Sequence, residues 1–248
     1  MKTMRTALAA TAMAVGLAQT ADAGDYNGNF MVRVLGTGII TQDSLSSLRS
    51  VSGAPVSDLK AAGFDASVSD EVIPAATLTY FLNKKFSLEL LCCFAKHDVS
   101  LKAPPAFAAL TGNIGETWIF PPAVTLQYHF DGLGPFKPYV GVGGQYIAFF
   151  NEKTGGNTLQ ATSVEIDGAF GVTVQAGFDV AIGNGWYLNA DVKKTWLDTT
   201  ATWRNSAVTG GDIVAKVDLD PLIISAGLGY RFNLEDLFGP RTSHVPLK

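Results

Sequence analysis

The sequence predicts an all-β fold, namely an eight-stranded antiparallel transmembrane β-barrel with long extracellular loops and short periplasmic turns. Two observations carry this prediction: apolar and polar residues alternate in one segment after another, and long and short connections alternate between those segments. The alternation is clearest at 222–232, where the even positions are apolar or aromatic and the odd positions from Ser225 to Arg231 are small or polar. Successive side chains of a strand point to opposite faces, and about 11 residues of tilted strand cross a bilayer.

An export signal precedes the predicted barrel. A short basic segment is followed by small and apolar residues that end in Ala21-Asp22-Ala23. This is the pattern of a secretory signal peptide with an A-x-A cleavage site, so the mature chain is expected to start near Gly24. An anchoring helix is disfavoured because the apolar part is short. The predicted organisation is a signal peptide at 1–23, a barrel at 24–232 and a periplasmic tail at 233–248.

Composition excludes several classes of function. Removing Lys2, Arg5 and Asp22 from 18 basic and 22 acidic residues leaves 16 and 21, a net charge of −5. The chain has no basic patch, so nucleic acid is not an expected partner. After the leader, no stretch approaches the roughly 18 apolar residues of a spanning helix, although 47% of the residues are hydrophobic. Such an exported chain fits an outer membrane, and outer-membrane lipid is its first expected partner.

Eight strands can be placed along the chain, at 29–36, 71–81, 86–95, 121–130, 138–150, 170–180, 186–199 and 218–232. The connections after the first, third, fifth and seventh strands are long and are interpreted as loops, at 37–70 (with a short helical piece around 57–62), 97–118, 151–167 and 200–212. The other connections are short turns. An even strand count with this alternation puts the long connections outside the cell and both chain ends in the periplasm.

The interior of an eight-stranded barrel has room only for side chains or one small ligand. The predicted lumen-lining or binding residues are Glu89, Leu91, Gln127, Tyr139, Gln175, Asp191, Lys193 and Arg231. Centring the hairpin on Asn184 puts Asp179 opposite Asn189 and Gln175 opposite Lys193. The polar members are expected to form a network that either plugs the barrel or sets its constriction. The structural role is favoured because confined charges must be paired.

Apolar and aromatic residues complete the predicted site. Leu91 and Tyr139 would give a ligand an apolar foothold in the lumen. Six aromatic residues fall near the loop-side ends of strands and are expected to form an interfacial girdle, with one or two at a ligand entry. They are Trp118, Phe120, Phe149, Phe150, Trp196 and Trp203.

The sequence offers no basis for catalysis or for a cofactor. The adjacent Cys92 and Cys93 should point to opposite faces of a strand and behave as small apolar residues. His97, His129 and His244 are scattered, and no spacing marks a nucleophile with its base. The sequence contains no phosphate-binding loop and no metal-ligand cluster. The chain is therefore expected not to be an enzyme and to bind neither metal nor cofactor.

Several segments, in order and spacing, resemble the outer membrane protein W (OmpW) family. They are FPPAVTLQYHF at 120–130, KPYVGVG at 137–143, QAGFD at 175–179, LNADVKK at 188–194, and the closing stretch from LDP at 219–221 to GYRF at 229–232. The resemblance covers nearly the whole mature chain. It implies an eight-stranded barrel with a narrow channel for small hydrophobic molecules.

One departure from the family pattern concerns the C-terminal end. The family typically ends at the Phe that closes the last strand, whereas residues 233–248 follow Phe232 here. This puts in doubt whether Phe232 signals to the barrel-assembly machinery in the usual terminal form. A disordered extension is favoured over a segment that contacts a periplasmic partner.

The predicted function is passive passage of small hydrophobic ligands across the bacterial outer membrane. The alternative is a plugged structural or receptor barrel without transport activity. A continuous hydrophobic lumen would favour the first function, and a fully paired polar plug would favour the second.

Overall fold

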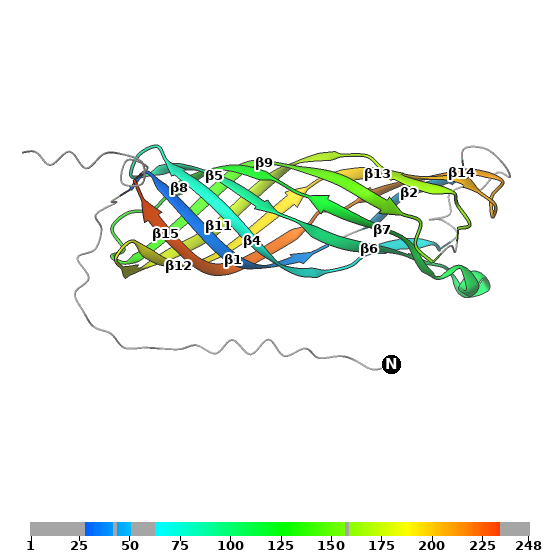
Figure 1. The fold of residues 1–248 in the computed structure, drawn as a ribbon, viewed down its shortest axis with the longest axis horizontal. Coiled ribbons are helices and arrows are strands. Elements are labelled where there is room, and N and C mark those ends of the chain that lie inside the picture. The colour runs from blue at the N-terminus through cyan, green and yellow to red at the C-terminus, as the bar shows by residue number, and fades with distance from the viewer. Residues whose placement is uncertain (1–27, 42–43, 51–62, 157–158, 234–248) are drawn as a thin grey trace, which may run out of the picture.

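The computed structural model describes residues 28–41, 44–50, 63–156 and 159–233 (Figure 1). The predicted signal peptide, the helical piece around 57–62 and the tail beyond Asn233 lie outside the described residues. The prediction for each therefore stays a prediction.

Eight antiparallel strands form the barrel (Figure 1). They are β1 (Phe30–Ile40), β4 (Glu71–Phe81), β5 (Phe86–Cys93), β8 (Ala123–His129), β9 (Phe136–Lys153), β11 (Ala169–Gly183), β12 (Trp186–Trp196) and β15 (Leu222–Phe232). Each pairs with its neighbour along the chain, β1 pairs with β15, and β11 pairs with both β9 and β12. The sheet thus closes on itself, which leaves no unpaired edge within the barrel.

Turn chemistry fixes the register of the strands at the end where the connections are short. Asn184 lies between Gly183 and Gly185, and all three have positive φ, as a tight hairpin requires. Asp179 accordingly pairs with Asn189. The pairing of Gln175 with Lys193 is likewise confirmed.

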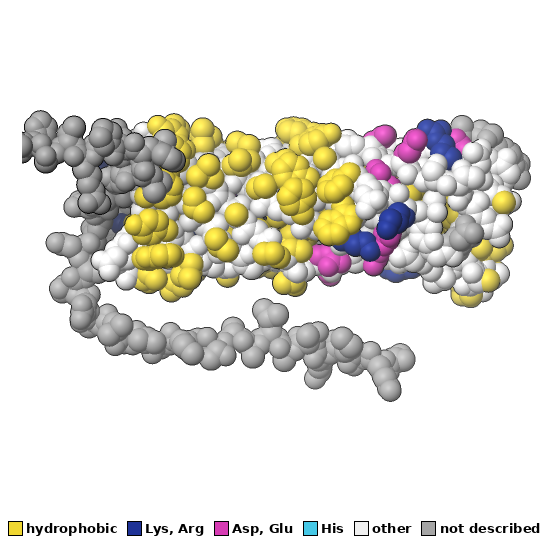
Figure 2. All heavy atoms as spheres, viewed as in Figure 1, with side chains coloured by type: hydrophobic (Ala, Val, Ile, Leu, Met, Phe, Trp, Pro, Cys, Tyr) yellow, Lys and Arg dark blue, Asp and Glu magenta, His cyan; other side chains and the backbone are white. Residues whose placement is uncertain are grey.

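The barrel has an apolar outer surface and a polar interior. In β5 the outward residues Phe86, Leu88 and Leu90 are exposed, whereas Ser87 and Glu89 are buried. Figure 2 shows, on the face in view, apolar side chains over the barrel. Charged side chains gather beyond them, towards the end that carries the long connections. This is the arrangement of a barrel wall in lipid.

Aromatic side chains lie at both limits of the apolar surface. At the short-turn end, Phe30, Tyr80 and Phe232 form one contacting group, and other pairs repeat the pattern around the barrel. At the other limit, the Phe94 ring stacks on Phe120 and meets Phe150 edge-on. Aromatic residues at these two levels mark the membrane–water interfaces.

The long connections are largely strand rather than loop. The additional elements are β2 (Ser44–Ser50), β3 (Asp65–Val68), β6 (Ala95–Lys102), the 3₁₀ helix η1 (Pro105–Leu110), β7 (Gly112–Phe120), β10 (Ser163–Ile166), β13 (Asp198–Ser206) and β14 (Gly211–Asp218). The interpretation of 37–70, 97–118, 151–167 and 200–212 as loops is therefore wrong for most of the described positions. Within the described residues, no helix has the length and hydropathy needed to cross a membrane.

The strands of the long connections, called the outer hairpins below, form two groups at the end of the barrel opposite the short turns. The groups are β3-β6-β7-β9, which includes the end of the barrel strand β9, and β10-β13-β14-β2. The alternation of the barrel is inverted here. In β14, Ile213, Ala215 and Val217 point inward and are buried, while Lys216 is exposed. Water surrounds these hairpins instead of lipid, so their apolar side chains pack inside. Their outward faces therefore lack the apolar stripe of a membrane strand.

Candidate functional site

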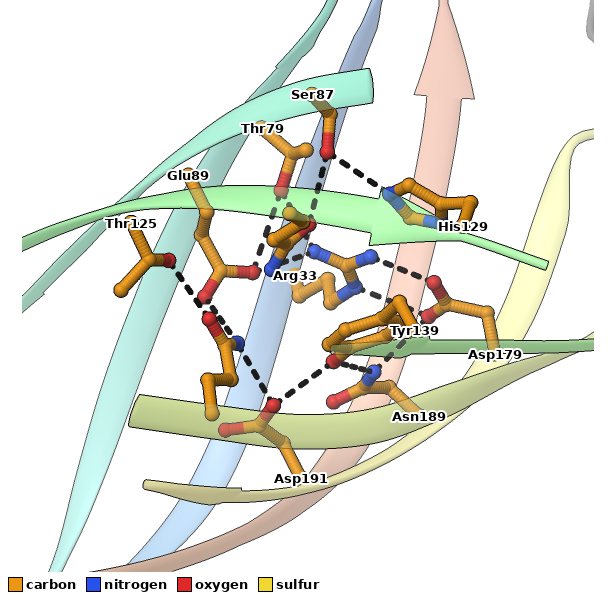
Figure 3. Close-up of polar contacts among 12 residues, drawn as sticks. Arg33, Thr79, Ser87, Glu89, Thr125, His129, Tyr139, Asp179, Asn189 and Asp191 are labelled. Atoms are coloured by element: carbon orange, nitrogen blue, oxygen red, sulfur yellow. Dashed lines mark hydrogen bonds and ion pairs between the residues drawn. The ribbon is translucent and has the colours of Figure 1, made fainter. Parts of the chain in front are cut away.

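Arg33 is the centre of a buried polar network in the lumen (Figure 3). The network occupies the half of the lumen nearer the short turns, which we call the inner half. Its Nε and Nη2 donate to the two carboxylate oxygens of Asp179, at 3.0 and 2.6 Å. Its Nη1 donates to Thr79 Oγ1 at 2.6 Å and to Glu89 Oε2 at 2.8 Å. The arginine is fully buried, so its charge is stabilised by these partners rather than by bulk water.

Lys193 is the second buried cation of the network. Its ammonium group forms ion pairs with Glu89 at 3.0 Å and with Asp191 at 2.5 Å. Glu89 therefore joins the two cations, with one carboxylate oxygen on Arg33 and the other on Lys193. The five charged side chains come from strands β1, β5, β11 and β12, so the network links opposite walls of the barrel.

Neutral donors complete the coordination of the carboxylates. Gln175 Nε2 donates to Glu89 Oε1 at 2.8 Å and to Asp191 Oδ2 at 2.7 Å. The Tyr139 hydroxyl donates to Asp191 at 3.0 Å. Asn189 Nδ2 donates to Tyr139 Oη and to Asp179, both at 3.0 Å. Ion pairs and hydrogen bonds thus cross-link the inner lumen into a polar plug, in which Asn189 Oδ1 and Gln127 Nε2 have no hydrogen-bond partner among the described residues.

The network continues towards the short-turn end. The Ser87 hydroxyl donates to Gln127 Oε1 at 2.9 Å and lies 2.8 Å from His129 Nε2. Farther along, the Arg231 guanidinium lies 3.6 Å from the centre of the Phe81 ring, and its Nε donates to the carbonyl of Gly28. The lumen is thus occupied by side chains down to this end.

The outer half of the lumen is a chamber of different chemistry. A cavity of about 70 Å³ lies there between the two groups of outer strands. Its wall is mainly apolar and includes Ile39, Ile119, Ile147, Ala201 and Trp203. We call this cavity the outer chamber.

A small apolar cluster, called the apolar layer here, adjoins the outer chamber, and its member Ile223 lines the chamber as well. Its buried members are Ala75, Leu91, Cys93, Ala123 and Ile223. The lumen thus changes from an apolar cavity, through this layer, to a paired network of charges.

All eight residues predicted to line the lumen point inward and are buried: Glu89, Leu91, Gln127, Tyr139, Gln175, Asp191, Lys193 and Arg231. The structure divides them among three places. Glu89, Tyr139, Gln175, Asp191 and Lys193 belong to the network around Arg33. Leu91 is in the apolar layer, whereas Gln127 and Arg231 lie nearer the short-turn end.

The six predicted aromatic residues also separate. Trp118, Phe150 and Trp196 are exposed on the outer surface, as a girdle requires. Phe149 and Trp203 instead line the outer chamber. Phe120, half-buried, stacks on Phe94.

Sequence reasoning did not select Arg33 or Asp179 as site residues, although both occupy inward positions of their strands. An arginine opposite the apolar Val32 and Val34 is a charge inside a membrane strand, and that signal was sufficient to propose it. Cys92 and Cys93 point to different faces and form no disulfide. Among the described residues, no group of three or more His, Cys, Asp and Glu side chains is arranged to hold a metal ion.

Known proteins resemble this chain in both sequence and structure. The outer-membrane protein y4mB of Sinorhizobium fredii is 35% identical over 205 residues, which cover 82% of this chain and 80% of that protein. Outer membrane protein W of Vibrio cholerae is 32% identical over 161 residues, 63% of this chain and 71% of that protein. The crystal structure of OprG from Pseudomonas aeruginosa, 27% identical, superposes with a TM-score of 0.75 over 85% of this chain and 98% of OprG.

The family assignment follows from the match to the whole barrel. Residues 26–232 match the OmpW family, a range that includes all eight barrel strands and the outer hairpins. The apolar outer surface and the two aromatic levels agree with the membrane named in these relatives. The chain belongs to the OmpW family and is an outer-membrane β-barrel.

Proposed function

We propose that the chain takes up small hydrophobic molecules from outside the cell into the outer chamber and releases them into the membrane, without catalysis. The observation that carries the proposal is the change in chemistry along the lumen. The surface of the chamber wall is mainly apolar, so transfer of an apolar ligand from water into it is favourable by roughly 25 cal/mol for each Å² buried.

The plug argues against a straight path into the periplasm. An apolar molecule moving along the axis would have to separate the ion pairs of Glu89 with Arg33 and Lys193, all three buried. Breaking one buried pair costs about 3–5 kcal/mol, and an apolar ligand offers no replacement partner. A sideways route through the wall avoids this cost.

One part of the wall suits such a route. The pairing of β5 with β8 ends at Leu91 and Ala123, and that of β6 with β7 resumes at Ala95 and Ile119. The intervening Pro121-Pro122 has no backbone N–H to donate. Pro121 also lines the outer chamber, so the interrupted pairing lies beside the cavity. We infer that ligands leave here.

The chamber can be tested by filling it. Ala201 points into the chamber and is 6% exposed, so Ala201→Trp should occupy ligand space. Ala226 faces outward on β15, and Ala226→Trp is the matched control on the lipid side. Uptake of a small hydrophobic compound and of a sugar of similar size is measured in cells that carry each variant or lack the protein.

We expect uptake of the hydrophobic compound to fall in cells that lack the protein and in cells with Ala201→Trp. It should persist in cells with Ala226→Trp. Loss of sugar uptake alone would mean a polar pore and would refute it. The second candidate is a structural or receptor barrel without transport, which the paired plug favours. For that function, neither deletion nor Ala201→Trp changes the uptake of either compound.

A further inference from the structure

We propose that the outer chamber prefers hydrophobic molecules that carry a hydrogen-bond donor, such as a phenol or an alcohol, and that Gln145 is the acceptor that binds the donor. This inference rests on the proposed function and specifies its ligand class. It comes from an unpaired oxygen in the wall of the chamber and from the hydrogen bonds of the polar groups around it.

Gln145 lies at the inner end of the chamber. It points inward from β9 and is 1% exposed. Its backbone partner on the neighbouring strand β8 is Ala123, a member of the apolar layer. Its Nε2 donates to the carbonyl of Pro121 at 3.2 Å. Its Oε1 is buried, and no donor among the described residues reaches it.

The orientation of this amide follows from its partner. The Pro121 carbonyl can only accept, so the amide nitrogen of Gln145 must face it, and the oxygen must be the atom left over. Exchanging the two atoms would set two acceptors against each other. The unsatisfied group is therefore an acceptor, and a ligand that satisfies it must be a donor.

Four other side chains that line the chamber have already used their donors on backbone carbonyls. The hydroxyls of Thr41, Thr117 and Thr199 donate to the carbonyls of Val68, Trp118 and Asp167, and the indole N–H of Trp203 donates to that of Ile114.

His97 offers a lone pair in the same way. Its Nδ1 lies 2.8 Å from the carbonyl of Ser69, so Nδ1 carries the proton and Nε2 of the neutral ring has a lone pair. The three hydroxyls and the His97 ring therefore keep only acceptor lone pairs, and Trp203 has no further donor to offer.

An acceptor wall discriminates between ligands of similar size. A phenol can donate to Gln145 Oε1 and satisfy it. A methyl ether of the same ring leaves Oε1 without a donor, which is the unfavourable outcome for a buried polar group. The discrimination expected from one such hydrogen bond is about ten-fold in affinity.

The test compares phenol with anisole, which differ only in that a methyl group replaces the donor hydrogen. Full-length protein in lipid nanodiscs is equilibrated with each probe, and binding to empty nanodiscs is subtracted. The measured quantity is the ratio of phenol affinity to anisole affinity. It is compared among wild type, Gln145→Leu and a control, Gln127→Leu, which makes the same change in the plug, outside the chamber wall.

We expect Gln145→Leu to lower this ratio about ten-fold, mainly through phenol, and Gln127→Leu to leave it unchanged. In wild type, the Gln145 side-chain amide should shift in NMR spectra with phenol and much less with anisole, a readout that requires no variant. An unchanged ratio together with equal shifts would overturn the preference while leaving the chamber as a ligand site. Failure of both probes to bind would overturn the proposed function as well.

Discussion

Replacing Arg33 by methionine tests whether the plug holds the barrel together. Arg33→Met keeps most of the side-chain volume and removes the charge that faces both Asp179 and Glu89. Two unit charges about 4 Å apart interact by about 4 kcal/mol at an effective dielectric constant near 20. Loss of the arginine also removes its own desolvation cost. The net loss expected for breaking a buried pair from one side is therefore about 3–5 kcal/mol.

The chain offers a matched control in Arg204. Like Arg33, it bridges two carboxylates, those of Glu165 and Asp212, at 2.8 and 3.0 Å. Unlike Arg33, it lies on the outer hairpins with its side chain 45% exposed. Exposed pairs contribute little because water and salt screen them. Arg204→Met is therefore expected to leave the free energy of unfolding unchanged within error.

The assay is equilibrium unfolding by urea in phospholipid vesicles, followed by tryptophan fluorescence. Asp179→Leu is added to Arg33→Met to complete a double-mutant cycle. Because the double variant leaves no lone partner of that pair, it should be more stable than the two single effects predict, by about 2–3 kcal/mol. Equal effects of Arg33→Met and Arg204→Met, or additivity within about 0.5 kcal/mol, would refute the reasoning.

Three further predictions concern local structure. Gly143→Ala should abolish folding because its Cβ would lie 1.9 Å from the Val124 carbonyl oxygen. Gly36→Ala should fold, since the nearest atom to its Cβ would be 3.9 Å away. The measurement is the folded fraction after refolding. Asn184→Val should cost about 1–2 kcal/mol in urea unfolding because of the positive φ, and Asn184→Gly should not. Burial lowers the pKa of His97 in the outer hairpins, so stability should fall as the pH drops below 6.5, and less so in His97→Gln.

The sequence predicts the barrel well because lipid imposes a strict pattern on it. Each membrane strand must present an apolar face to the bilayer, and the polar interior supplies the contrast. The same reasoning misses the outer hairpins. Ala201 and Trp203 point inward from β13 there, between outward residues such as Thr202 and Arg204, so no apolar outward stripe marks a membrane strand.

The candidate site could be predicted as a set of residues and not as a network. Alternation shows which side chains face inward, and the eight selected residues do so. It cannot show which of them meet across the lumen. Arg33 reaches Asp179 over 146 residues of sequence and Glu89 over 56, distances set by the closure and stagger of the whole barrel.

In the proposed function, the order of the two halves of the lumen decides which way an apolar ligand moves. A molecule in the outer chamber lies next to the apolar layer that contains Leu91. The charged carboxylate of Glu89 is two residues from Leu91 along β5, towards the short turns. Moving inward requires the separation of buried ion pairs, whereas moving sideways requires the parting of strands where Pro121 and Pro122 already lack donors. In the proposed function, an intact plug therefore directs the ligand sideways into the membrane. We therefore infer that weakening the plug, for example by Arg33→Met, would let water and ions pass before it increased hydrophobic uptake.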